Sequence, residues 1–178
     1  MNYYYLVASL PMLTLGRESP LGLPAFRDLC AEHLTVPDLA VLDDLLATGG
    51  TGTADSFVSA WRERETRLRN SIVRARAARR GLDPDPHVRP EMGFDVYTRK
   101  VVDDAFARSS PADREMDLDH FRWSVLEELA GHDMFALPAV LAYALKLRLV
   151  ERWSRMDAAA GRRRVDDFVS QQTATASL

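Results

Sequence analysis

Two charged residues could do chemistry because each interrupts the apolar face of a predicted helix. At about 3.6 residues per turn, Glu65 falls between Trp61 and Leu68 on an apolar stripe. Lys146 falls in the middle of the apolar face of a helix predicted over residues 137–156. A carboxylate beside a lysine can act as a general base, but such a pair needs a pocket that the sequence does not reveal. Because an unpaired buried charge is unfavourable by several kcal/mol, we predict a structural Glu65–Lys146 ion pair between two packed helices.

A dense run of arginines marks the helix predicted over residues 55–80. The run comprises Arg62, Arg64, Arg67, Arg69, Arg74, Arg76, Arg79 and Arg80. It could contact phosphates, dock on an acidic protein or form a solvated helix face. Trp61 belongs to the apolar stripe, so the run lacks the base-stacking aromatics of a nucleic-acid site. We therefore favour a solvated or protein-docking surface, and the residues expected on the docking face are Arg62, Arg69, Arg76 and Arg80.

The remaining candidates lack the spacing that catalysis or metal binding requires. Cys30 and His33 lie three residues apart on a predicted helix, but nothing nearby marks an activated nucleophile. The other histidines do not share a helix face, and no cysteine cluster joins them. The string TGGTGT at residues 48–53 lacks the closing Gly-Lys-Ser/Thr of a phosphate loop, so we interpret it as a flexible link. We predict no catalytic, cofactor-binding or metal-binding residue and no cofactor.

Size and composition are those of an ordinary globular chain. A length of 178 residues suffices for one domain with a stable core, and the net charge of −3 argues against wholesale nucleic-acid binding. The single cysteine excludes an intramolecular disulfide, which is typical of a reducing cytosol. The opening MNYYYLVASLPML does not resemble a signal peptide, and Lys146 breaks the best candidate for a membrane span. We expect a cytoplasmic protein.

Apolar periodicity predicts an all-α fold, a helical bundle of six to seven helices. The expected helices cover residues 24–35, 37–47, 55–80, 97–107, 118–130, 137–156 and 162–169. The apolar run over residues 3–10 fits either a short strand or the start of a helix. We predict a single helical domain over residues 1–172, with the proline-rich loop 82–96 as the candidate sub-boundary, and a flexible tail over residues 173–178.

Three stretches of the chain together resemble a known bacterial family. They are the opening YYYLVASLPML, the central E-x-x-L-R-N followed by R-A-x-x-x-G, and the late LAYALKLRLVERW. The central motif consists of Glu65, Leu68, Arg69, Asn70, Arg76, Ala77 and Gly81. Over most of its length the chain is similar to the family named domain of unknown function 2764.

The resemblance implies a role beside a V-type (A/V-type) rotary ATPase, because genes of this family usually stand among its subunit genes. It also implies distant kinship with the all-helical C/d subunit, which caps the membrane rotor ring and seats the central stalk. No catalytic residues are implied. We therefore expect a non-catalytic accessory subunit that binds other V-type ATPase subunits, peripheral to the inner face of the cell membrane. The alternatives are an arginine-rich nucleic-acid-binding or regulatory adaptor protein and, third, an enzyme built on Glu65 and Lys146.

Overall fold

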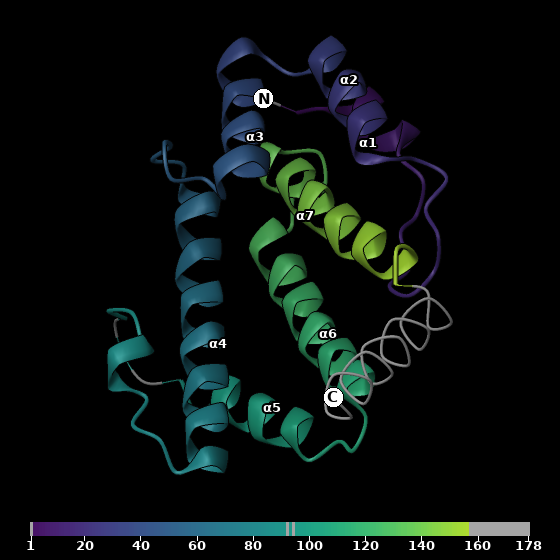
Figure 1. The fold of residues 1–178 in the computed structure, drawn as a ribbon. Coiled ribbons are helices and arrows are strands. Elements are labelled where there is room, and N and C mark those ends of the chain that lie inside the picture. The colour runs from purple at the N-terminus through teal and green to yellow at the C-terminus, as the bar shows by residue number, and fades with distance from the viewer. Residues whose placement is uncertain (1, 92, 94, 157–178) are drawn as a thin grey trace, which may run out of the picture.

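The computed structural model describes residues 2–91, 93 and 95–156, which form seven α-helices and no strand (Figure 1). The helices are α1 (Tyr4–Ser9), α2 (Leu23–His33), α3 (Val36–Thr48), α4 (Ser56–Arg80), α5 (Val96–Phe106), α6 (Pro111–Ala130) and α7 (Leu137–Ser154). A short 3₁₀ helix, η1 (Asp85–His87), lies in the proline-rich segment. The all-α prediction is confirmed. The helix expected over residues 162–169 and the tail 173–178 lie outside the described residues.

Local sequence signals set both ends of α4, the longest described helix. The carboxylate of Asp55 accepts a hydrogen bond from the backbone N–H of Val58 at 3.0 Å, which satisfies one free N–H of the first turn. At the other end, Gly81 adopts the left-handed conformation with a φ of 64°. The helix therefore ends at Arg80, where the sequence predicts its end.

The N-terminal apolar run forms helix α1, so the strand alternative is wrong. The helix buries Leu6 completely. Just before it, the N–H of Tyr3 donates to the carbonyl of Phe135 at 2.6 Å, and the hydroxyl of Tyr3 hydrogen-bonds to the carboxylate of Asp38. A helix forms part of its backbone hydrogen bonds internally, and the contacts of Tyr3 attach this short segment without a partner strand.

The glycine-rich segment 48–53 is a tethered turn rather than the flexible link that its composition suggests. Gly50 has a φ of 80°, and a side chain at this position would overlap Val58 of α4. The carboxylate of Asp44 accepts a hydrogen bond from the N–H of Gly52 at 2.9 Å. The turn therefore holds the end of α3 beside the first turns of α4.

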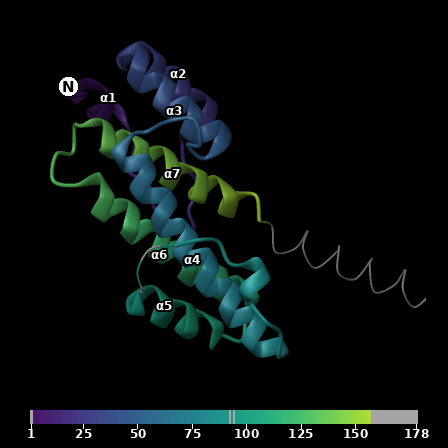
Figure 2. The ribbon, with the colours of Figure 1, turned by 90° about the vertical axis from the view of Figure 1, so that its left-hand side faces the viewer.

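The helices enclose two groups of buried apolar side chains, which meet at Trp61 and Leu129. The first core lies mainly among α1, α2, α3 and α7, and it includes Leu6, Phe26, Leu42, Leu45, Leu141 and Leu147. The second core lies among α4, α5 and α6, and it includes Leu68, Val102, Phe106, Leu118, Phe121 and Val125. Figure 2 shows the two groups of helices one above the other, with α4 running from one to the other.

The proline-rich segment 82–96 is held against α4 by the buried side chain of Asn70. The amide oxygen of Asn70 accepts a hydrogen bond from the N–H of Arg89 at 2.9 Å, and its amide nitrogen donates to the carbonyl of Arg89 at 2.8 Å. An ion pair of 2.7 Å between Arg74 and Glu91 adds a second attachment. Helices before and after the segment share the second core.

Candidate functional site where α3, α4, α6 and α7 meet

Glu65 projects from α4 toward α6 and pairs with Arg122. The Nε of Arg122 donates to Oε2 of Glu65 at 3.0 Å and its Nη2 donates to Oε1 at 3.2 Å, which makes a bidentate pair. From the next turn of α4, the Nε of Arg69 donates to the same carboxylate at 2.8 Å. The side chain of Glu65 is 13% exposed, so this charge is mostly buried, as its position on the apolar stripe predicts.

Lys146 pairs with Glu127 of α6, so the predicted Glu65–Lys146 ion pair is wrong. The Nζ of Lys146 lies 3.1 Å from Oε1 of Glu127 and 4.7 Å from the ring centroid of Trp123, also on α6. The lysine side chain is 16% exposed. The prediction assumed that the two long helices pack directly together. In the structure α6 packs against both and supplies each charge with a separate partner. The general-base arrangement of Glu65 beside Lys146 is therefore absent as well.

Asp119 of α6 is the fully buried centre of this charged network. Its carboxylate accepts hydrogen bonds from Nη1 of Arg122 at 2.9 Å and from the indole Nε1 of Trp153 at 2.8 Å. A third donor is the guanidinium of Arg152 on α7. Three donors satisfy the carboxylate that burial would otherwise destabilise. Asp119 therefore joins α6 to α7, and Arg122 extends the network to Glu65 of α4.

Arg122 connects the two carboxylates and is itself largely buried, with 14% of its side chain exposed. Burial alone lowers the pKa of Arg122, but hydrogen bonds and charge attraction from Glu65 and Asp119 outweigh it and raise the pKa above its usual value. The guanidinium therefore stays charged and acts as a fixed hydrogen-bond donor rather than as an acid or a base.

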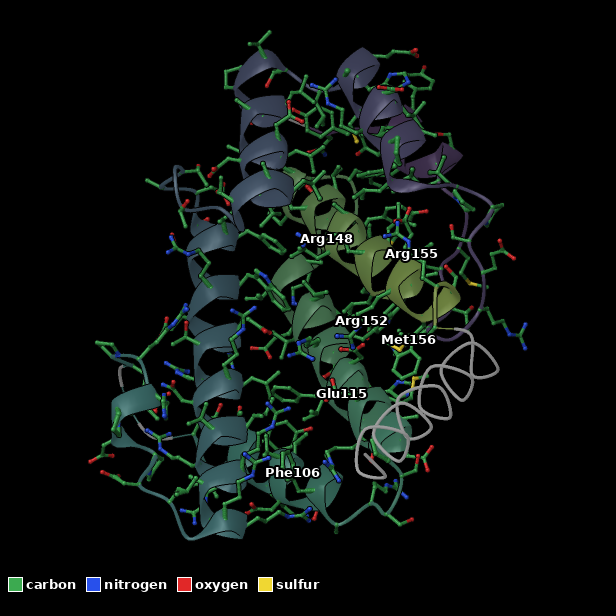
Figure 3. All side chains as sticks on the ribbon, in the orientation of Figure 1. Phe106, Glu115, Arg148, Arg152, Arg155 and Met156 are labelled. Atoms are coloured by element: carbon green, nitrogen blue, oxygen red, sulfur yellow. The ribbon has the colours of Figure 1, made fainter. Side chains whose placement is uncertain are left out.

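A pocket of about 670 Å³ adjoins this network, because Glu65, Arg122 and Arg152 are among its lining residues. It is bounded by the end of α3, by α4, α6 and α7, and by Arg89 of the proline-rich segment. Six arginines line it: Arg62, Arg69, Arg89, Arg122, Arg148 and Arg152. Glu65 is the one carboxylate among the lining residues that the structure describes. Figure 3 labels Arg148 and Arg152, which both come from α7, and it shows Arg152 beside α6.

The arginines of the pocket differ in how much of their charge is already used. Arg69, Arg122 and Arg152 contact Glu65 or Asp119. The guanidinium of Arg62 donates to the carbonyl of Gly50 at 3.2 Å. Within the described part of the chain, the exposed side chains of Arg89 and Arg148 have no carboxylate partner. The pocket therefore holds positive charge that these carboxylates do not neutralise.

The four arginines of the predicted docking face do not all lie at the same place in the structure. Arg62 and Arg69 line the pocket, whereas Arg76 and Arg80 lie farther along the same helix, outside it. Arg76 and Arg80 are exposed, and neither has a carboxylate partner among the residues described. The docking role of this face stays a prediction.

The other sequence candidates contribute no further site. Cys30 is completely buried in the first core, and burial raises the pKa of its thiol to about 12, which disfavours the reactive thiolate. Over the described ranges, no cluster of three histidine, cysteine, aspartate or glutamate side chains is placed to hold a metal ion. No helix in the same ranges combines the length and apolar character needed to cross a membrane.

Sequence reasoning finds the two buried charges but misses most of the site around them. It does not bring Asp119, Arg122, Arg148 and Arg152 together, because periodicity places a residue on a helix face and does not identify the neighbouring helix. One available signal is the spacing of Asp119 and Arg122, since residues three apart on a helix can pair.

Residues 91–172 match the family described as Protein of unknown function (DUF2764), so the chain carries a DUF2764 domain in this region. The matched region contains the late stretch LAYALKLRLVERW, whereas the opening stretch and the motif around Glu65 lie outside it. Asp119, Arg122 and Arg152 lie inside the domain, and the arginine run of α4 precedes it. No curated protein and no solved structure matches the chain.

Proposed function

We propose that the protein is a non-catalytic accessory subunit of a bacterial V-type rotary ATPase. In this role it binds other subunits from the cytoplasmic side and links the soluble stalk to the membrane sector, in the manner of the C/d subunit. The choice of this assembly rests on the resemblance of the three sequence stretches. The DUF2764 domain over residues 91–172 supports the family part of that resemblance.

The observation that carries the docking role is the exposed arginine face of α4. This helix has 25 residues, and both cores support it from behind through side chains such as Phe57 and Leu68. Arg76 and Arg80 project from a rigid element and have no carboxylate partner within the described ranges. Such a surface suits an acidic protein partner, and electrostatic complementarity of this kind mainly sets association rate and specificity.

Co-purification tests the proposal directly. The tagged full-length protein, isolated from the source organism at low salt, should retain V-type ATPase subunits identifiable by mass spectrometry. Raising the salt concentration should release them, because exposed charges more than about 8–10 Å apart are screened at physiological ionic strength. The double variant Arg76→Glu/Arg80→Glu should lose most of the bound subunits while keeping its melting temperature nearly unchanged.

The matched control is the double variant Arg17→Glu/Arg99→Glu, which makes the same change in charge away from this face. It should retain the ATPase subunits. If the wild-type protein recovers no ATPase subunit, or if both double variants lose binding equally, the proposed role of the α4 face is wrong. Tight RNA binding at physiological salt would instead favour the alternative of a nucleic-acid-binding adaptor.

A further inference from the structure

We propose that the arginine-lined pocket binds a small molecule that carries two or more phosphate groups. This inference does not depend on the ATPase proposal, because it concerns the pocket and not the outer face of α4. Its basis is a local imbalance of charge. Six arginines line the pocket, while the carboxylates that contact them are Glu65 on the wall and Asp119 beneath it, with Glu115 at 4.0 Å from Arg152.

Positive charge remains after these contacts are counted. Glu65 is occupied by Arg122 and Arg69, and Asp119 by Arg122 and Arg152. The remaining lining arginines, Arg62, Arg89 and Arg148, have no carboxylate partner among the described residues. Like charges held on one concave surface repel one another. A bound polyanion would be attracted to all of these arginines and would offset the repulsion between them.

The shape of the site favours a small ligand over a macromolecule. The pocket volume of about 670 Å³ lies in the range of about 300–1,000 Å³ that is typical of small-molecule sites. Its arginines come from three helices and one loop, so they converge from several sides instead of forming the flat stripe that suits a duplex or a protein surface. The planar guanidinium group can bind phosphate oxygens in a bidentate manner, which favours phosphate as the recognised group.

The arginines nearest the floor of the pocket are held in place before any ligand binds. Glu65 and Asp119 fix the guanidinium of Arg122 through hydrogen bonds of 3.0 Å, 3.2 Å and 2.9 Å. Asn70 fixes the backbone of Arg89 at the rim through its two hydrogen bonds. The guanidinium of Arg122, held in this way, loses little conformational entropy on binding, whereas the exposed side chains of Arg89 and Arg148 are free to close on the ligand.

Apolar residues of α4 and α7 also line the pocket and leave room for an organic group. Trp61, Leu145 and Leu149 line the pocket beside the arginines. A nucleoside di- or triphosphate could place its phosphates against the arginines and its base against this apolar part. Inorganic polyphosphate shares the phosphate chemistry but would use the arginines alone, so the two ligands can be distinguished experimentally.

Binding can be measured on the full-length protein by isothermal titration calorimetry and by thermal melting, with ATP and sodium tripolyphosphate as separate probes. At a probe concentration about 100 times the Kd, the melting temperature should rise by about 5–10 °C. The variants Arg148→Ala and Arg89→Ala should each raise the Kd about tenfold, because each removes a charge-assisted hydrogen bond at the pocket. Neither arginine pairs with a described carboxylate, so both variants should melt near the wild-type temperature without probe.

Arg76→Ala is the matched control, because it removes one exposed arginine of α4 that lies outside the pocket and has no carboxylate partner among the described residues. It should leave the Kd of both probes within about twofold of the wild-type value. Binding of ATP alone would identify a nucleotide site, and equal binding of the two probes would identify a phosphate site. If neither probe binds at 1 mM, if Arg76→Ala weakens binding as much as Arg148→Ala, or if a glutamate-rich peptide binds more tightly than either probe, the proposal is wrong.

Discussion

The two cores of the molecule stabilise their helices in different ways. The first core, among α1, α2, α3 and α7, contains sixteen buried apolar residues within the described ranges, and the second core contains eight. The smaller core borders the charged network of Glu65, Arg122 and Asp119, which lies where α4 and α6 approach α7. The first region relies mainly on apolar burial, with the half-exposed Arg27–Asp43 pair at its surface, and the second adds buried ionic contacts to a smaller apolar interior.

The arginine-lined pocket lies where these two regions meet, because α3 and α7 of the first region and α4 and α6 of the second all contribute lining residues. Buried charges are weak evidence for stability, because desolvation opposes most of the attraction between them. Here Glu65 and Arg122 of the charged network also line the arginine-lined pocket, and the carboxylates of the network hold guanidinium groups in fixed positions. The border between the two regions is therefore ionic, and it forms a preorganised polar site between two apolar interiors.

The largest expected effect comes from removing the buried centre of the network. Asp119→Ala should lower the free energy of unfolding by about 3–5 kcal/mol, because Arg122 and Arg152 would lose their shared buried partner. Asp117→Ala, two residues earlier on α6, removes a partly exposed partner of Arg108 and should cost no more than about 1 kcal/mol. Urea denaturation of both variants measures the contrast. A loss below about 1 kcal/mol for Asp119→Ala would contradict the importance given to this residue.

Cavity-forming substitutions compare the two apolar interiors directly. Leu147→Ala in the first core and Leu118→Ala in the second remove the same side chain from positions that are 0% and 1% exposed. Both should destabilise by about 2–5 kcal/mol, with Leu147→Ala toward the upper end because the first core has sixteen buried apolar residues against eight in the second. Denaturation midpoints at equal m-values provide the test. A larger cost for Leu118→Ala would show that the second core is the better packed of the two.

Double-mutant cycles compare the ion pair that the structure contains with the pair that the sequence predicts. Glu65→Ala should cost about 1–3 kcal/mol, since the largely buried Arg122 loses a bidentate acceptor but keeps Asp119. The coupling energy between Glu65→Ala and Arg122→Ala should fall within about 0.5–3 kcal/mol. The coupling energy between Glu65→Ala and Lys146→Ala should stay within about 0.5 kcal/mol of zero, because Glu65 pairs with Arg122 and Lys146 pairs with Glu127. A large Glu65–Lys146 coupling would restore the pairing that the sequence predicts.

These residues also show which features of the fold the sequence could reveal. Strong periodicity bounded by Asp55 and Gly81 predicts α4 to within one residue at its start and correctly at its end. The same reasoning misses the start of α6 because the first turns of this helix are polar. Ser110 and Pro111 mark that start by capping chemistry, which apolar periodicity does not detect.

The candidate site is harder to predict because it depends on tertiary neighbours. Glu65 and Lys146 are recognisable as misplaced charges, since each breaks an apolar stripe within its own helix. Their partners belong to a third helix, and no pattern within one helix identifies them. The pocket also needs Arg89, which reaches it because Asn70 holds the proline-rich segment against α4.

The smallest expected effect concerns the N-terminal cap of α5. It tests whether a charged side chain, Asp95, also stabilises a helix at the edge of the second region. The carboxylate of Asp95 accepts hydrogen bonds from the N–H of Thr98 at 3.1 Å and from its hydroxyl at 2.6 Å. Burial alone would raise the pKa of Asp95. The hydrogen bonds from Thr98 and from the backbone of Tyr97 outweigh burial, together with the charge of Arg64, and the pKa of Asp95 falls below its usual value. Asp95→Ala should therefore cost about 1 kcal/mol at pH 7.

The pH dependence of that cost distinguishes the charge from the hydrogen bond. A carboxyl whose pKa is depressed in the folded state stabilises fully above its unfolded pKa of about 3.9, and this stabilisation is lost as the pH falls through the folded pKa. The difference between wild type and Asp95→Ala should thus be constant above about pH 5 and shrink below about pH 4. Asp95→Asn keeps an acceptor without the charge, so its cost relative to Asp95→Ala should not vary with pH. Denaturation curves between pH 3 and pH 7 measure both differences, and a gap that widens toward acid would contradict the lowered pKa of Asp95.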